Sequence, residues 1–264
     1  MTASSNDNTT LPPSDPSQDQ PEKSGIGDTI KVIVQALLIA LVIRTLLFQP
    51  FVIPSGSLIP TLLIGDYLFV SKFSYGYSRF SLPWGIIPFK GRIWGAEPKR
   101  GDITVFASPK NDGTDFVKRV IGLPGDTIQM VDNVLVINGT PVKRERIGSY
   151  PEIDQWGKTI QAPLYRETLP NGHSYTIMER EGVGSYWANT FLYKVPENHY
   201  FMMGDNRDNS ADSRDLASMG YVPFDNLIGR AEVTFFSLDE GTSAWQIWKW
   251  PQEVRWDRVF KRIQ

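Results

Sequence analysis

Ser57 is the residue whose setting in this sequence most suggests a nucleophile. It lies in the stretch PSGSLIPTL, residues 54–62, directly after a long apolar segment, and this stretch contains no acidic or basic residue. A serine hydroxyl needs a nearby base before it can attack a carbonyl carbon. The chain of 264 residues has two histidines, His173 and His199, and each stands alone in a turn-like stretch. We expect both to be ordinary surface or capping residues, although a Ser-His-Asp triad stays open.

Lysine is the remaining candidate for the base. It accepts a proton only when neutral, and its ordinary pKa near 10.4 keeps it charged at pH 7. Burial among apolar groups lowers that pKa because it disfavours the ammonium ion. Lys118 has the best setting, within DFVKRVIGLPGD at residues 115–126, where Phe116 and Val117 precede it in a strand-like run. The alternative is a strand lysine that points to solvent. Arg119 points to the opposite face, because strand side chains alternate.

Composition and charge exclude several other classes of function. The net charge of about −2 creates no strong field, so we expect no nucleic-acid partner. The chain has no cysteine, which removes disulfides, thiolate catalysis and cysteine-bound zinc. The signatures of phosphate loops, dinucleotide folds, zinc peptidases and α/β-hydrolases are absent from the sequence. The loop GDNRDNSADSR, residues 204–214, is polar enough for calcium, but Ser213 and Met219 stand where an EF-hand needs glycine and glutamate. We expect no metal and no cofactor.

An apolar segment near the N-terminus predicts one transmembrane helix. The stretch VIVQALLIALVIRTLLF, residues 32–48, spans about 26 Å as a helix, slightly less than a bilayer core. We place the anchor at residues 28–49, after a polar and disordered tail at 1–27. A buried soluble helix and a removable signal peptide are the alternatives. Lys23 and Lys31 precede the apolar stretch 32–48, whereas residues 49–70 contain no lysine or arginine, which predicts a cytoplasmic N-terminus.

After the anchor, short alternating and β-branched runs broken by Gly, Pro and Asn predict a mostly β fold. Asn138 and Gly139 lie between apolar runs and predict a hairpin turn, because both tolerate positive φ. The chain between the motif-rich stretches is more polar and less regular. We therefore predict an antiparallel-sheet core, an inserted smaller β domain and an aromatic and basic C-terminal segment. Their predicted ranges are 50–126 with 197–236, 127–196, and 237–264.

Four motifs in order carry a resemblance to bacterial type I signal peptidases, the serine-lysine leader peptidases. They are PSGSLIPTL after the anchor, GDYLFVSKFSYG at 65–76, KRGDITVF at 99–106 with DFVKRVIGLPGD at 115–126, and GDNRDNSADSR at 204–214. Together they cover most of the predicted core, and their combination is specific to that family. The predicted insert and the tryptophan-rich C-terminus carry little of the resemblance.

The resemblance implies a membrane-bound serine endopeptidase that removes N-terminal signal peptides from exported preproteins. It makes Ser57 the nucleophile and Lys118 its general base, with an acyl-enzyme as the intermediate. Ser55 matches the family position whose hydroxyl forms the oxyanion hole together with the backbone N–H of Ser57. The remaining matched positions orient the lysine or support the site from behind. They are Ser210, which orients the lysine, the ion pair of Asp212 and Arg214, and Arg119.

The resemblance also implies cleavage after small residues at the −1 and −3 positions, because shallow apolar pockets exclude larger side chains by overlap. Two departures from the family pattern stand out: Leu58 replaces a common methionine, a volume-conserving change, and only one membrane span is visible where some members have two. The substrate-binding positions carried over are Ile53, Pro54, Leu58, Leu62 and Phe116 around the first pocket, and Phe51, Val105 and Val117 near the second.

The expected partners are signal peptides and membrane lipids. Residues 82–94, LPWGIIPFKGRIW, and residues 245–250, WQIWKW, place aromatic side chains beside Lys and Arg, a composition favoured at membrane interfaces. The expected location is the bacterial inner (plasma) membrane, with the catalytic domain outside. Two alternatives remain: a self-cleaving repressor-type serine-lysine protease, which should be soluble and carry a DNA-binding module, and an inactive anchored scaffold that binds export substrates.

Overall fold

The apolar N-terminal segment forms helix α1, Ile26–Leu46. The structure is a computed structural model, and it describes residues 26–81, 89–110, 112–153, 157–180, 184–242 and 245–263. The chain divides into two compact units after Leu41. Within the described ranges, α1 is the one helix long and apolar enough to cross a membrane. Between Val32 and Ile43 its side chains are apolar on every side apart from Gln35, as expected of a helix that faces lipid. The helix ends earlier than predicted, because Phe48 and Gln49 begin the first strand.

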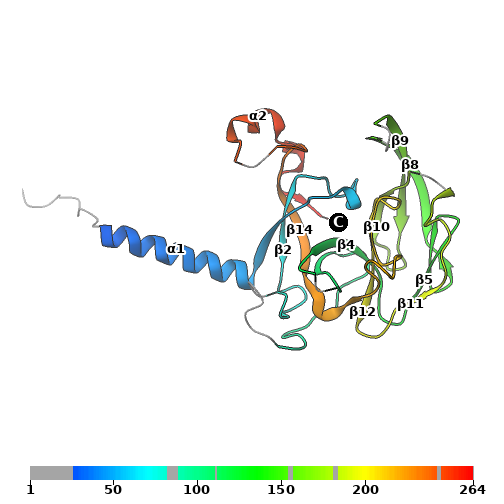
Figure 1. Ribbon diagram of the computed structural model, residues 1–264, viewed down its shortest axis with the longest axis horizontal. Helices are drawn as coiled ribbons and strands as arrows, with labels where there is room; N and C mark the ends of the chain where they lie inside the picture. The colour runs from blue at the N-terminus through cyan, green and yellow to red at the C-terminus, as the bar shows by residue number, and fades with distance from the viewer. Residues whose placement is uncertain are drawn as a thin grey trace, which may run out of the picture. The chain divides into compact units, whose positions relative to one another are not determined.

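One antiparallel sheet of eight strands forms the centre of the second unit (Figure 1). Its strand order is β1-β2-β14-β3-β4-β12-β13, and β15 pairs with β14. The long strand β14 carries register shifts against both β2 and β3, which bend the sheet. The strands of the large sheet are β1 Phe48–Val52, β2 Asp66–Ser71, β3 Ile103–Ala107, β4 Asp115–Gly122, β12 His199–Met203, β13 Val222–Pro223, β14 Leu227–Ser237 and β15 Lys261–Arg262.

The chain between β4 and β12 forms two smaller antiparallel sheets. One has the order β10-β9-β8 and the other the order β11-β5-β6-β7. The strands are β5 Thr127–Val131, β6 Val134–Ile137, β7 Thr140–Pro141, β8 Lys143–Ile153, β9 Thr159–Thr168, β10 Ser174–Met178 and β11 Tyr193–Lys194. Asn138 and Gly139 join β6 to β7 with φ angles of 52° and 76°, which confirms the hairpin turn. The mostly β fold with one apolar N-terminal helix is therefore confirmed, whereas the residue limits of the insert stay a prediction.

The C-terminal segment joins the large sheet through β15 and through a buried ion pair. Arg258 donates from Nε to Asp66 Oδ1 at 3.0 Å and from Nη2 to Oδ2 at 2.5 Å, and the Asp66 side chain is fully buried. Helix α2, Trp250–Glu253, lies in this segment, where Trp245 and Trp248 are exposed. The other aromatic stretch falls partly outside the described residues, and its Trp94 is exposed. Membrane contact at either stretch stays a prediction.

Candidate active site

Ser57 and Lys118 meet although 61 positions separate them in the chain. The Nζ atom of Lys118 lies 2.5 Å from the Oγ atom of Ser57, and both side chains are buried, with 4% and 8% of their surface exposed. Ser57 lies in a 3-10 turn, Gly56–Leu58, a few residues after the end of β1. This turn contacts β4 of the large sheet. Lys118 lies on β4, and β4 is an inner strand between β3 and β12. The sheet therefore buries the amine, and the turn brings the hydroxyl to it.

Burial changes the acid-base chemistry of Lys118. Loss of water around the amine lowers the pKa of Lys118 to about 8, from an ordinary value of 10.5. Three charged neighbours modify this effect: the carboxylates of Asp212 and Asp205 raise the pKa, and the guanidinium of Arg214 lowers it. The amine is therefore neutral in a substantial fraction of molecules near pH 8, as a proton acceptor must be.

The polar loop 204–214 is buried behind this pair. Arg214 donates from Nε to Asp212 Oδ1 at 2.8 Å and from Nη2 to Oδ2 at 2.8 Å, and the N–H of Gly204 donates to the same carboxylate at 3.1 Å. Burial by itself would raise the pKa of Asp212, but the paired Arg214 outweighs it and keeps the pKa below its usual value. The loop therefore places a buried ion pair next to the lysine.

Two residues of the loop that the sequence did not single out hold the Ser57 turn. The backbone N–H of Asn206 donates to the Ser57 carbonyl oxygen at 3.0 Å, and its Nδ2 donates to the Gly56 carbonyl oxygen at 3.1 Å. Asp205 accepts two hydrogen bonds from Arg119, both of 2.8 Å, and one from Thr61 Oγ1 at 2.6 Å. The loop therefore joins β4 to both ends of the turn that carries Ser57.

Ser210 lies near the pair without the hydrogen bond to Lys118 that the resemblance implies, and Ser55 directly precedes the turn that carries Ser57. Ser210 is buried, and a Cβ on Gly204 would overlap its Oγ, yet this Oγ has no hydrogen-bond partner. The predicted hydrogen bond from Ser210 to Lys118 is therefore not formed in this structure. Ser55 precedes the 3-10 turn in extended conformation, is exposed and makes no capping hydrogen bond. Its hydroxyl thus stays available at the edge of the site.

Comparison with known proteins decides the family. The sequence model of the family "Signal peptidase, peptidase S26" matches residues 26–236. Signal peptidase I of Rickettsia typhi (strain ATCC VR-144 / Wilmington) is 43% identical over 243 residues, which cover 86% of this chain and 90% of that protein. The chain belongs to the signal peptidase I family. Signal peptidase I of Rickettsia prowazekii (strain Madrid E) is 42% identical, again over 86% of this chain and 90% of its own.

Family membership makes the chain an enzyme that cleaves signal peptides as a serine protease. With the apolar helix α1, it also indicates a membrane-anchored peptidase. A crystal structure of a signal peptidase I from Enterococcus faecalis V583 is similar as well, with 29% identity and a TM-score of 0.30, and the match covers 51% of this chain and 97% of that one.

The positions carried over as substrate-binding residues fall into different surroundings in the peptidase. Six belong to or pack against one hydrophobic cluster of the large sheet: Phe51, Ile53, Leu58, Leu62, Val105 and Val117. Phe116 packs against a second cluster instead, where its ring stacks on Phe106 at 6.0 Å. Pro54 is exposed. The structure thus brings most of the predicted aliphatic wall together and separates Phe116 from it.

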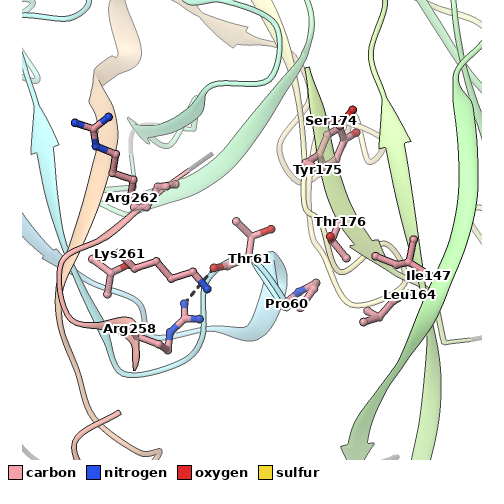
Figure 2. Close-up of a pocket in the computed structure, with 12 residues that line it drawn as sticks. Pro60, Thr61, Ile147, Leu164, Ser174, Tyr175, Thr176, Arg258, Lys261 and Arg262 are labelled. Carbon is pink, nitrogen blue, oxygen red and sulfur yellow. Dashed lines mark hydrogen bonds between the residues drawn. The ribbon is translucent and has the colours of Figure 1, made fainter. Parts of the chain in front are cut away.

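A cavity of about 420 Å³ lies beside the Ser57 turn (Figure 2). Pro60 and Thr61 line one side, and Tyr175 and Thr176 of β10 line the opposite side. Arg258 donates from Nη2 to the Thr61 carbonyl oxygen at 3.1 Å and forms part of a basic wall. Ser57 does not line this cavity, so the cavity lies next to the Ser57–Lys118 pair and does not contain it.

Neither histidine bonds to the Ser57–Lys118 pair. His173 lies beside Arg119 on the other face of β4, with its Nε2 3.3 Å from Nη1 of that arginine. His199 contacts the Glu197 carbonyl oxygen through Nδ1 at 2.8 Å. In the part of the chain that the structure describes, no group of three His, Asp or Glu side chains is placed to hold a metal ion.

We predict that Gly204→Ala strongly reduces cleavage. An added Cβ would overlap both Ser210 Oγ and the Ser57 carbonyl oxygen, so the turn must move away from Lys118. We expect kcat on a detergent-solubilised preprotein to fall by about tenfold or more, because small displacements of reacting groups are costly. Gly184→Ala is the matched control, since a Cβ there meets nothing within 4 Å. Equal activity of the two variants would contradict the close packing described here.

Proposed function

We propose that the peptidase cleaves its substrates with a Ser57–Lys118 dyad through an acyl-enzyme. The support is the 2.5 Å contact between Lys118 Nζ and Ser57 Oγ within a buried site that lowers the lysine pKa to about 8. In the first step, the neutral amine takes the hydroxyl proton while Oγ attacks the carbonyl carbon of the scissile bond. The C–N bond then breaks, the leaving amine of the mature protein takes the proton from Lys118, and an ester to Ser57 remains.

Water completes the reaction in the second step. Lys118, again neutral, takes a proton from a water molecule, whose oxygen attacks the ester carbonyl carbon. The bond to Ser57 Oγ breaks, Oγ receives the proton back from Lys118, and the signal peptide leaves with a new carboxylate. The Asp212–Arg214 ion pair behind the amine supports both steps, since Arg214 opposes the rise in the Lys118 pKa that Asp212 causes, and burial has the largest effect on that pKa.

The tetrahedral oxyanion would be stabilised by the backbone N–H of Ser57 and the hydroxyl of Ser55. The exposed position of Ser55 and the absence of a capping bond support this role, since its hydroxyl can turn to a substrate.

The aliphatic side chains near Ser57 favour small residues at −1 and −3, because filled apolar surroundings exclude larger groups. Replacing Ala by Phe at −1 of the same preprotein should therefore abolish its cleavage in a gel assay, and unchanged cleavage would contradict this specificity.

Removal of either member of the dyad should abolish turnover. We expect Ser57→Ala and Lys118→Ala each to lower kcat/KM on a detergent-solubilised preprotein by about a thousandfold or more. The matched control is Lys110→Ala, which removes an exposed lysine from the turn after β3 and should leave the rate unchanged. Circular dichroism spectra should show all variants folded. Substantial cleavage by a folded Ser57→Ala or Lys118→Ala would exclude the dyad, and a folded wild type without turnover would favour the inactive scaffold.

The rate should rise with pH through the titration of Lys118. Only the neutral amine accepts the serine proton, and the pKa of Lys118 is about 8. We therefore expect kcat/KM to increase about tenfold per pH unit below pH 7 and to level off above pH 9. A chelator such as EDTA should not change the profile. A rate that is flat from pH 6 to 9, or one lost with EDTA, would show that another group or a metal controls the reaction.

We also propose that the enzyme spans the bacterial inner membrane once, with its N-terminus in the cytoplasm. Two observations support this orientation: Lys23 and Lys31 lie before the apolar stretch 32–48, and residues 49–70 contain no lysine or arginine. Protease added to spheroplasts should degrade the catalytic domain and spare a tag fused to the N-terminus. Degradation of the tag with protection of the domain would reverse the orientation.

A further inference from the structure

A buried ion pair links the inserted sheets to the polar loop 204–214. Arg207 lies in the loop 204–214, and Glu167 lies on β9 of the insert. Arg207 donates from Nη1 to Glu167 Oε1 at 3.0 Å and from Nη2 to Oε2 at 2.5 Å. The exposed fractions of the two residues are 2% and 0%, so this two-pronged contact is closed to water.

Tyr175, on the neighbouring strand β10, completes the contact. Its hydroxyl donates to Glu167 Oε2 at 2.7 Å and accepts from Arg207 Nη2 at 3.0 Å. Burial raises the pKa of Tyr175 well above its ordinary value, so the hydroxyl keeps the proton that it donates. The guanidinium of Arg119 lies over the ring, 4.2 Å from its centre. The insert therefore contacts the arginine that follows Lys118 as well as the polar loop 204–214.

The loop carries this contact to the reacting pair within two residues. Met178, at the end of β10, accepts from the N–H of Arg207 and donates to the Asp205 carbonyl oxygen, both at 2.9 Å. Asn206 between them holds the Ser57 turn with its two hydrogen bonds. On the other side, the Arg207 carbonyl oxygen accepts from Arg214 Nη2 at 2.6 Å. The consecutive residues 205–207 thus bind β4, the Ser57 turn and the insert.

The chemistry of the contact favours a role in orientation. Burying two charges costs much of what their attraction returns, so such a pair adds little stability compared with apolar side chains of the same size. A two-pronged arginine–carboxylate contact instead fixes distance and angle, since both partners are planar. We propose that Glu167 and Tyr175 are positioning residues of the peptidase, which fix Arg207 and so keep Ser57 within hydrogen-bonding distance of Lys118. This inference rests on the proposed Ser57–Lys118 dyad.

Glu167→Gln tests the proposal, because it keeps the shape of the side chain and removes its charge. We expect kcat on the preprotein to fall about tenfold at pH 7, with KM changed less than about twofold, since Glu167 is fully buried and has no surface to offer a substrate. The pH midpoint should rise, because a displaced turn admits water to Lys118, whose charged neighbours Asp212, Asp205 and Arg214 remain. Part of the lost rate should therefore return at pH 9 to 10.

Two further variants keep the test decisive if Glu167→Gln does not fold. Tyr175→Phe removes only the hydroxyl and should cause a smaller loss of kcat with a midpoint shift in the same direction. Glu167→Asp restores the charge and should recover part of the rate relative to Glu167→Gln. Val142→Ala is the matched structural control. The substitution removes buried atoms from a hydrophobic cluster to which the insert contributes side chains, and Val142 takes no part in the contacts of Glu167 or Arg207.

The pH profile separates positioning from stability. Val142→Ala should lower the melting temperature and leave kcat and the pH midpoint of the folded enzyme unchanged. If Glu167→Gln and Tyr175→Phe also change only the melting temperature, the insert merely stabilises the fold and the proposal is wrong. The dyad itself is judged separately, by Ser57→Ala and Lys118→Ala in the same assay. Loss of turnover in those two variants with normal kcat in Glu167→Gln would overturn this inference alone.

Discussion

A buried lysine amine that contacts a serine hydroxyl is the interaction around which the other buried groups of the site are arranged. Lys118 is on an inner strand of the large sheet, where burial stabilises the neutral amine, Asp212 and Asp205 favour its charged form, and Arg214 opposes them. A single carboxylate behind the amine would favour the ammonium ion, and a single guanidinium would repel it. The Asp212–Arg214 pair supplies both charges in one rigid unit. The site therefore needs buried polar groups close to the lysine and must neutralise them among themselves.

Loop 204–214 meets this requirement because nearly every charge within it has a buried partner. Asp205 is bound by Arg119, Asp212 by Arg214, and Arg207 by Glu167. These pairs face three different parts of the molecule, namely β4, the loop itself and the insert. Buried polar groups are costly when unpaired, so the loop has few alternative conformations once the sheets are formed. A loop of this composition would be solvated in isolation, and its rigidity comes from the surrounding fold.

A second buried lysine shows that a lowered pKa alone does not distinguish the proposed base from other lysines. Burial and the charge of Arg44 lower the pKa of Lys72 to about 8, the same value as for Lys118. The amine of Lys72, however, donates to the Ser81 carbonyl oxygen at 2.5 Å, and that atom has no proton to give. Lys118 differs because its amine meets a hydroxyl. A lowered pKa therefore marks candidates, and the bonding partner decides between them.

The sequence alone was enough to predict the apolar anchor, the mostly β fold, the Asn138–Gly139 hairpin and the two residues that meet at the site. Each depends on local pattern or on short motifs, which a single chain displays directly. The sequence did not predict the contacts of Asn206, Glu167 and Tyr175. Glu167 and Tyr175 lie in an insert without chemical motifs, and their partner Arg207 is distant in the chain, so no periodicity links them. It also implied a Ser210 hydrogen bond that is not formed, and it grouped Phe116 with side chains of another cluster. These contacts could be seen only in the folded protein, because the burial and pairing of a side chain depend on strands that are far apart in the chain.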